Sequence, residues 1–254
     1  MNYENIGKVI AKVINKNDKK KDRIISINDK TDEIDNPMTK IVLTKSFEII
    51  QQIPNKQQER QILYITGASG SGKSYYTQLY CNEYKKLYPK NEIFLFSSIN
   101  EDSSIDKIKG LQRFILDDSF IRENIGAEDF KDSMVIFDDT DVISNKMLKL
   151  KINSILNALL ETGRHYNTSV IYTSHIATAG IDTKRILNEA HSITIFPSSL
   201  GGRSLKYLLD NYLGFDKEQI KKVKKLDSRW TTICKTYPMV VLSEKEAYLL
   251  KNDD

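Results

Sequence analysis

Short apolar runs recur through the middle of the chain. They cover residues 62–66, 93–97, 134–137, 169–173 and 192–196. Runs of this length without polar alternation are typical of strands that are buried on both faces, as in a parallel sheet. A further strand is predicted at residues 113–116.

Segments with helical spacing lie between these runs. A helix is predicted from residue 73 to about residue 88, where Pro89 ends it. After the run 134–137, apolar residues recur at three- and four-residue steps, namely Leu148, Ile152, Ile155, Leu156, Leu159 and Leu160. Alternating strands and amphipathic helices predict an α/β fold with a mostly parallel central sheet flanked by helices.

The two ends of the chain have different patterns. We predict strands at residues 6–14 and 23–27, while residues 40–53 mix strand and helix signals. Near the C-terminus we predict helices at residues 204–212 and 217–225, followed by strands at 231–235 and 239–242. The chain is therefore predicted to divide into an N-terminal appendage, residues 1–60, with a β-hairpin and a linker, and a main domain, residues 61–254, with a C-terminal helical and strand extension.

Composition narrows the class of protein. Of the 254 residues, 40% are hydrophobic and 28% are charged, which is typical of a globular protein rather than a disordered one. No apolar run approaches the ~18 residues that a membrane span needs, and the N-terminus lacks the pattern of a secretion signal. Cys81 and Cys234 fit no metal or disulfide motif, which favours free thiols in a reducing compartment. The net charge of +4 permits contact with nucleic acid without demanding it.

One motif carries specific chemistry. Residues 67–74 read GASGSGKS and match the phosphate-binding loop G-x-x-x-x-G-K-[ST], or Walker A motif, between a predicted strand and a predicted helix. The backbone N–H groups would hold the phosphates of ATP, Lys73 would reach the β- and γ-phosphates, and the Ser74 hydroxyl would bind Mg²⁺. An accidental glycine-rich turn is the alternative. The predicted nucleotide-binding residues are Gly67, Ala68, Ser69, Gly70, Ser71, Gly72, Lys73, Ser74 and Tyr75.

Two acids follow the strand at 134–137, as in a Walker B element. Asp138 would hold Mg²⁺ through its water shell, and Asp139 would orient the attacking water. A simple turn cap is the alternative for this pair, and Asp141 is interpreted as a surface or turn residue. If the interpretation holds, the acids should lie close to the loop, on an adjoining strand.

Polar residues also end the strand at 169–173. Ser174 or His175 could sense the nucleotide by hydrogen bonding, although an ordinary loop histidine is equally consistent with the sequence. Arg164, just past the Leu-rich helix, is the candidate arginine finger for a neighbouring subunit. It could instead bond the last carbonyls of its own helix. Arg185 and Arg203 are competing candidates.

These residues together resemble a known family. The Walker A loop, the sequence VIFDD at 135–139 and the sequence TGRHYNTSVIYTSH at 162–175 resemble the poxvirus-type DNA-packaging ATPases of large DNA viruses and virophages, in the FtsK–HerA branch of P-loop motors. The resemblance covers roughly residues 60–200. It implies a RecA/FtsK-like ATPase domain, an oligomeric ring of five or six subunits, and partners that include double-stranded DNA and capsid proteins. It also implies a location in the host cytoplasm or in association with the virion. Two departures are Asp139, where many members have Glu, and His175, where many have Gln.

Basic residues offer two candidate DNA-binding surfaces. One is the predicted helix that carries Lys217, Lys221, Lys222, Lys224 and Lys225, and the other contains Lys107, Lys109 and Arg113. A motor would hold DNA phosphates with such groups without reading the base sequence. A solvated charged helix face is the commoner explanation of a lysine run.

Three functions remain open from the sequence. The leading one is a viral genome-packaging ATPase that couples Mg-ATP hydrolysis to DNA translocation. A small-molecule P-loop kinase is a second possibility, although no clear lid segment is evident between residues 174 and 193. A nucleic-acid loader or scaffold that binds ATP as a switch, with little turnover, is the third.

Overall fold

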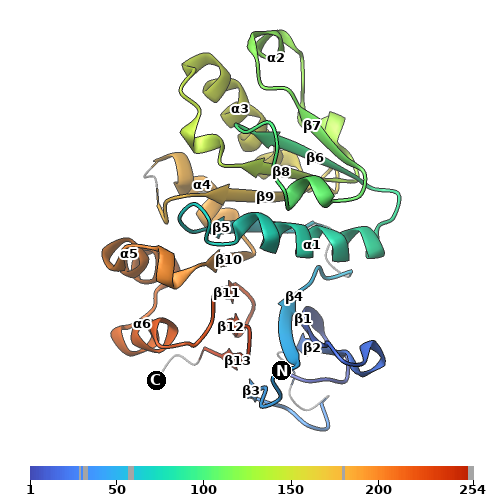
Figure 1. The fold of residues 1–254 in the computed structure, drawn as a ribbon, viewed down its shortest axis with the longest axis vertical. Helices are drawn as coiled ribbons and strands as arrows, with labels where there is room; N and C mark the ends of the chain where they lie inside the picture. The colour runs from blue at the N-terminus through green and yellow to red at the C-terminus, as the bar shows by residue number, and fades with distance from the viewer. Residues whose placement is uncertain (29, 31–33, 57–59, 179–180, 251–254) are drawn as a thin grey trace. The chain divides into compact units, whose positions relative to one another are not determined.

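The structure is a computed structural model of the whole chain, and it describes residues 1–28, 30, 34–56, 60–178 and 181–250. Two compact units are present (Figure 1). One is formed by Gln58–Ala190, and the other by Met1–Gln57 together with His191–Asp254. This grouping differs from the division at residue 60 that we predicted, because it places the two ends of the chain in one unit.

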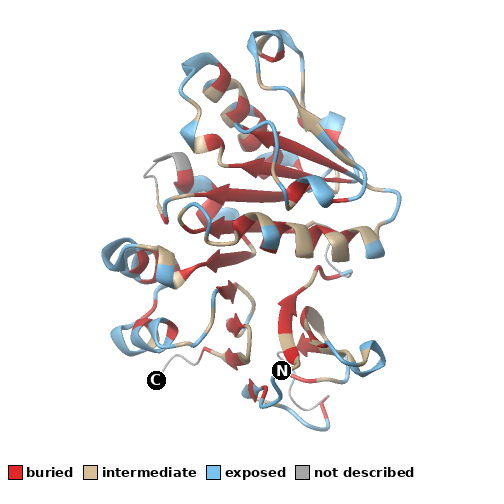
Figure 2. Cartoon of the chain, in the orientation of Figure 1, coloured by how far each residue is buried: buried red, intermediate tan, exposed pale blue. Residues whose placement is uncertain are grey.

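A parallel sheet forms the centre of the unit Gln58–Ala190. Its strands are β5 (Ile62–Thr66), β9 (Ser169–Ser174), β8 (Ser133–Asp138), β6 (Glu92–Ser97) and β7 (Leu111–Phe114), in that spatial order. Strands β5, β8 and β9 are buried along their whole length (Figure 2). The prediction of a mostly parallel, helix-flanked sheet is confirmed.

Helices cover this sheet. Helix α1 (Lys73–Leu87) connects β5 to β6, and α3 (Lys146–Thr162) connects β8 to β9. The two connections run in opposite directions across the sheet, so the right-handed crossover rule places the two helices on opposite faces. The six apolar residues predicted to form the stripe of α3 are all buried. Two further helices, α2 (Asp118–Arg122) and α4 (Ile181–Glu189), were not predicted.

Short 3₁₀ turns complete this unit. They are η3 (Ile105–Lys107), η4 (Ala127–Phe130) and η5 (Thr140–Val142). Helix α3 packs against α4 and η4, whereas α1 packs against η3. Turn η5 directly follows β8, and it therefore fixes the path of the chain just beyond the acid pair.

The other unit is built from antiparallel strands. Strands β2 (Arg23–Ile27), β1 (Lys8–Asn15) and β4 (Glu48–Gln52) form one sheet. A second run of paired strands has the order β3 (Lys40–Val42), β13 (Glu246–Leu249), β12 (Val240–Ser243), β11 (Thr231–Cys234) and β10 (Ser192–Ile195). Because β3 pairs with β13, this run contains strands from both ends of the chain.

The remaining elements of this unit are helices and short turns. They are α5 (Gly202–Leu213), α6 (Lys217–Lys224), η1 (Lys19–Lys21) and η6 (Pro197–Ser199). Helices α5 and α6 agree with the predicted positions to within two residues. Each buries an apolar face, which in α6 consists of Ile220 and Val223.

Two sequence-based expectations concern the whole chain. Among the described residues, no helix combines the length and the apolar character that crossing a bilayer requires. Cys81 and Cys234 are free and buried. Burial raises the pKa of both thiols, that of Cys234 to about 12, so both are protonated and unreactive at neutral pH.

Candidate active site

The glycine-rich loop connects β5 to α1. Gly70 and Gly72 have positive φ angles of 73° and 112°, which favour glycine because a side chain there would be strained. Gly72 also precedes the first residue of α1 and offers no side chain to cap the helix. The N–H groups of the first helical turn therefore face the loop, where the helix end favours an anion.

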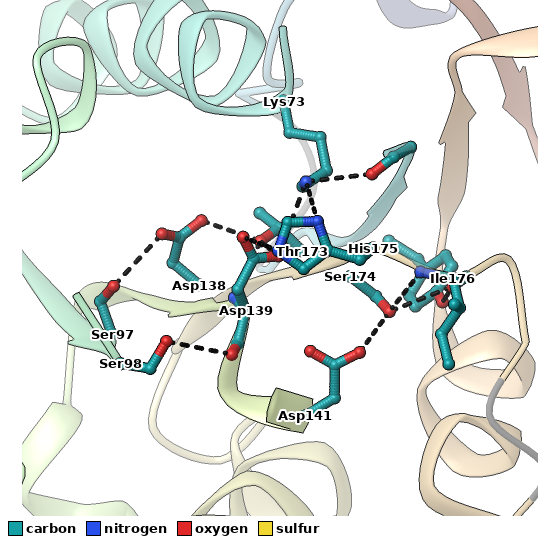
Figure 3. A network of polar contacts seen from close by, with 12 residues as sticks. Lys73, Ser97, Ser98, Asp138, Asp139, Asp141, Thr173, Ser174, His175 and Ile176 are labelled. Carbon is teal, nitrogen blue, oxygen red and sulfur yellow. Dashed lines mark hydrogen bonds and ion pairs between the residues drawn. The ribbon is translucent and has the colours of Figure 1, made fainter. Parts of the chain in front are cut away.

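Lys73 is the first residue of α1, and its side chain is buried. Its Nζ donates to the carbonyl of Gly67 at 3.0 Å, contacts His175 Nδ1 at 3.1 Å and lies 3.6 Å from Asp139 Oδ1 (Figure 3). The ammonium group thus stands at the centre of a polar network that joins the loop to the ends of two neighbouring strands.

Asp138 is the last residue of β8 and is only 2% exposed. Thr173 Oγ1 donates to its Oδ1 at 2.8 Å, and Ser97 Oγ donates to its Oδ2 at 3.3 Å. Burial, followed by the nearby charge of Asp139, raises the pKa of Asp138 to about 6. A carboxylate whose charge is opposed in this way fits a residue that helps to hold a divalent metal ion.

Asp139 follows β8 in the left-handed backbone region, with φ of 49°. Short polar residues such as Asp tolerate this region better than most side chains. Its N–H donates to Thr173 Oγ1 at 3.1 Å, and its Oδ2 lies 2.9 Å from His175 Nε2. The turn of the backbone directs the carboxylate toward Lys73 (Figure 3).

The position of the acid strand corrects one expectation. We expected the acids on a strand that adjoins the strand of the loop, but β9 lies between β5 and β8. Strand β9 is the parallel neighbour of the acid strand β8. Since all these strands are parallel, their carboxyl ends converge at one edge of the sheet, and Asp139 still reaches Lys73.

The two candidate sensors face different partners. Ser174 Oγ donates to Asp141 Oδ2 at 2.7 Å and is also 3.0 Å from the carbonyl of Ile176. His175 instead contacts Lys73 and Asp139. Asp141 lies in the turn η5, as expected, but it is half-buried and bonded to Ser174 rather than a plain surface residue.

Sequence reasoning missed Thr173, Ser97 and Asp141 as members of this network. Thr173 is the residue that joins the two acids, because its hydroxyl lies 2.8 Å from Asp138 Oδ1 and 3.3 Å from Asp139 Oδ1. Their positions in the sequence could have identified them. Each of the three residues ends a predicted parallel strand or follows one, at the edge where the loop lies.

Arg164 lies in the exposed turn between α3 and β9. This turn precedes β9, whereas the network lies at the other end of that strand, roughly 20 Å away for six residues. Arg164 is therefore remote from the site of its own chain. Arg185 forms an ion pair with Glu161, and Arg203 lies in α5 of the other unit.

The residues present fit a nucleotide with Mg²⁺. Ser71 Oγ, within the loop, is buried without a hydrogen-bond partner among the described residues. Ser74 is half-buried in the first turn of α1, and Tyr75 beside it is 57% exposed. No group of three His, Cys, Asp or Glu residues able to hold a metal occurs in the described part of the chain. Mg²⁺ would instead use Ser74 and Asp138 together with phosphate and water oxygens.

Comparison with known proteins identifies a related virophage protein. No family model matches the chain. Protein V3 of Sputnik virophage, described as uncharacterized, is 42% identical over 193 residues, which cover 75% of this chain and 78% of V3.

Two solved structures of ATPases are similar to this chain. The cytoplasmic domain of the Type VII secretion ATPase EccC from Thermomonospora curvata superposes with a TM-score of 0.51 at 11% identity, over 88% of this chain and 32% of that one. B204, the DNA-packaging ATPase of Sulfolobus turreted icosahedral virus, has a TM-score of 0.49 at 17% identity, over 74% of this chain and 98% of that one. The EccC likeness concerns the fold alone. On its 42% identity to V3, the chain belongs to the family of this virophage protein, and the virophage origin of V3 agrees with the resemblance that the sequence indicated.

Proposed function

We propose that this chain is an ATP-hydrolysing motor that moves double-stranded DNA into a viral capsid. One observation carries the ATPase part of the proposal. Lys73 of the loop, the acids Asp138 and Asp139, and the strand-end residue His175 meet in one network at the carboxyl edge of a parallel sheet. The packaging part rests on the sequence resemblance and on membership of a virophage family.

We propose a role for each residue of the network. The N–H groups of residues 67–74 bind the phosphates, and Lys73 places positive charge where negative charge develops during phosphoryl transfer. Asp139, half-buried and directed toward Lys73, orients the attacking water and accepts its proton. Mg²⁺, held through Ser74 and Asp138, would neutralise charge on the phosphate oxygens. Thr173 links the two acids, because its hydroxyl donates to Asp138 Oδ1 and accepts from the N–H of Asp139.

A homo-oligomeric ring completes the proposal. Arg164 is exposed at the amino edge of the sheet, remote from its own site, so it would act on a neighbouring subunit.

The test is phosphate release by the purified protein with Mg-ATP and no phosphate acceptor. We expect hydrolysis by the wild type, loss of nucleotide binding in Lys73→Ala, and retained binding with turnover lowered about 10²–10⁴-fold in Asp139→Asn. Hydrolysis that requires an added small-molecule acceptor would favour a kinase. Binding of ATP with negligible hydrolysis, even with duplex DNA present, would favour a nucleotide-switched loader.

A further inference from the structure

The two ring nitrogens of His175 contact groups of opposite charge. The residue follows β9, and its ring is about one third exposed. Its Nδ1 lies 3.1 Å from Lys73 Nζ, and its Nε2 lies 2.9 Å from Asp139 Oδ2 (Figure 3). The ring thus stands between the cation of the loop and the carboxylate proposed to orient water.

Only one protonation state satisfies both contacts. A lysine ammonium can only donate, so Nδ1 must accept; an ionised carboxylate can only accept, so Nε2 must donate. The ring is therefore neutral, with its proton on Nε2. A protonated ring would direct the N–H of Nδ1 at the ammonium of Lys73, which is unfavourable for charge and for hydrogen bonding.

His175 also makes the shortest of the contacts described for the Asp139 carboxylate. Oδ2 lies 2.9 Å from His175 Nε2, while Oδ1 lies 3.3 Å from Thr173 Oγ1 and 3.6 Å from Lys73 Nζ. The Thr173 hydroxyl has a single proton, and it lies closer to Asp138, at 2.8 Å. The imidazole is therefore the closest described partner of the Asp139 carboxylate.

We propose that His175 is a positioning residue whose two ring nitrogens have separate tasks: Nε2 aligns Asp139 for catalysis, and Nδ1 holds Lys73 in competition with the phosphates. This inference rests on the proposed ATPase function. Lys73 shares its three N–H groups among Gly67, His175 and Asp139. A phosphate oxygen that binds Lys73 must displace one of these, and the neutral Nδ1 is a weaker acceptor for a cation than an anionic oxygen.

Substitution can separate the two nitrogens. The amide nitrogen of Gln reaches about as far as Nε2, so His175→Gln keeps a donor for Asp139. Asn is shorter, and its amide oxygen can replace Nδ1 as an acceptor for Lys73, so His175→Asn loses the contact with Asp139. His175→Ala removes both contacts. His165→Gln, an exposed histidine at the opposite edge of the sheet, is the matched control.

The experiment measures kcat for ATP hydrolysis and, separately, the Kd for Mg-ATP in each variant. We expect kcat to fall roughly 10–100-fold in His175→Ala and His175→Asn, as for other residues that orient a catalytic group. His175→Gln should stay within about fivefold of the wild type and His165→Gln should equal it. The Kd should tighten roughly twofold to tenfold in His175→Ala, because one competing acceptor for Lys73 is removed.

Three results would overturn the inference. These are an unchanged kcat in His175→Ala, weakened ATP binding in step with kcat as a purely structural role would give, or Asn outperforming Gln.

Nitrogen NMR of labelled histidine tests the same inference without hydrolysis. The wild-type protein without added nucleotide should show His175 as the neutral ring protonated on Nε2, assigned by its loss in His175→Gln. Addition of Mg²⁺ with a non-hydrolysable ATP analogue should shift Nδ1 more than Nε2. A ring protonated on Nδ1 would refute the bridge. If the wild type binds ATP but never hydrolyses it, the proposed function fails, whereas this measurement still decides the role of His175.

Discussion

Asp138 lies where burial and a neighbouring carboxylate both oppose its negative charge. They raise its pKa to about 6, from a usual value near 4 in an unfolded chain. The folded state therefore binds a proton more tightly than the unfolded state does. Ionisation of Asp138 therefore destabilises the folded state relative to the unfolded state. This loss of stability appears as the pH rises from about 4 through about 6, and it is complete at higher pH.

The substitution Asp138→Asn removes this penalty. At pH 7.5, with metal chelated, we expect the variant to unfold with a free energy about 1–3 kcal/mol larger than that of the wild type, since one pKa unit corresponds to about 1.4 kcal/mol. Turnover should nevertheless be lost with the proposed metal ligand. Denaturant unfolding of both proteins at several pH values measures the difference, which should vanish below pH 4. A variant less stable than the wild type at pH 7.5 would contradict the assigned cause.

Individual site residues were predictable to different degrees. The role proposed for Lys73 follows from a motif with fixed spacing, and those proposed for the two acids follow from their place at the end of an apolar strand. The structure brings these residues together. The link through Thr173 could not be predicted, because which hydroxyl bonds a carboxylate depends on the register of β9 against β8. Likewise, only backbone geometry shows that Asp139 occupies the left-handed region that directs it toward Lys73.

Elements next to strong local signals were predicted best. Strand β5 has the predicted bounds and α1 starts where predicted, because the glycine loop marks the end of one and the start of the other. Strand β7 is displaced by two residues from its predicted place, and α2, α4 and β13 were not predicted. Strand β13 is only four residues long and mixes polar with apolar positions, so no periodicity identifies it. Its formation depends on pairing with β12 and β3.

A further prediction concerns Arg164, in the turn between α3 and β9. Arg164→Ala should keep ATP binding, because the turn is remote from the site of its own chain, but turnover should fall about 10³-fold or more for a finger that acts on a neighbour. Mixing the variant with wild type should lower activity by more than the fraction of variant added, because each variant subunit leaves a neighbour without its arginine.

Phosphate release at several mixing ratios measures this effect. Lys131→Ala, which removes another exposed base at the same edge of the sheet, is the control and should lower activity at most in proportion. Normal turnover by Arg164→Ala alone would remove this residue from the site and turn attention to Arg185 and Arg203.

At the scale of the whole molecule, the limit of sequence reasoning is non-local pairing. Strand β3 follows the N-terminal strands in sequence but pairs with β13, with Ile41 beside Ala247. No local pattern reports a pairing between segments so far apart in the chain, so the residues before the loop were interpreted as a separate appendage. The parallel sheet was predictable because its apolar runs alternate with helices, which fixes the class of the fold without long-range information.

Contact with DNA is also a property of the whole molecule. Helix α6 buries Ile220 and Val223 and exposes lysines, three of which are already engaged. Lys222 lies 3.7 Å from the centre of the Tyr248 ring, Lys221 lies 3.7 Å from Glu218, and Lys224 Nζ donates to the carbonyl of Gly202 at 3.4 Å. Lys217 and Lys225 are exposed at the two ends of the helix. If these two bind DNA phosphates, they do so by charge and without reading the base sequence.

The corresponding measurement is ATP hydrolysis with duplex DNA over a range of salt concentrations. Duplex DNA should stimulate the wild type, equally for unrelated base sequences, and the apparent DNA affinity should fall steeply as salt rises. Lys217→Glu with Lys225→Glu should weaken DNA affinity and reduce the logarithmic salt slope by about 2, because each of the two lysines would neutralise one phosphate. Lys19→Glu with Lys20→Glu changes the net charge equally at a distant exposed turn and is the matched control. Because net charge is identical in the two double variants, an equal loss of affinity in both would show that DNA responds to overall charge, and helix α6 would then have no special part in holding it.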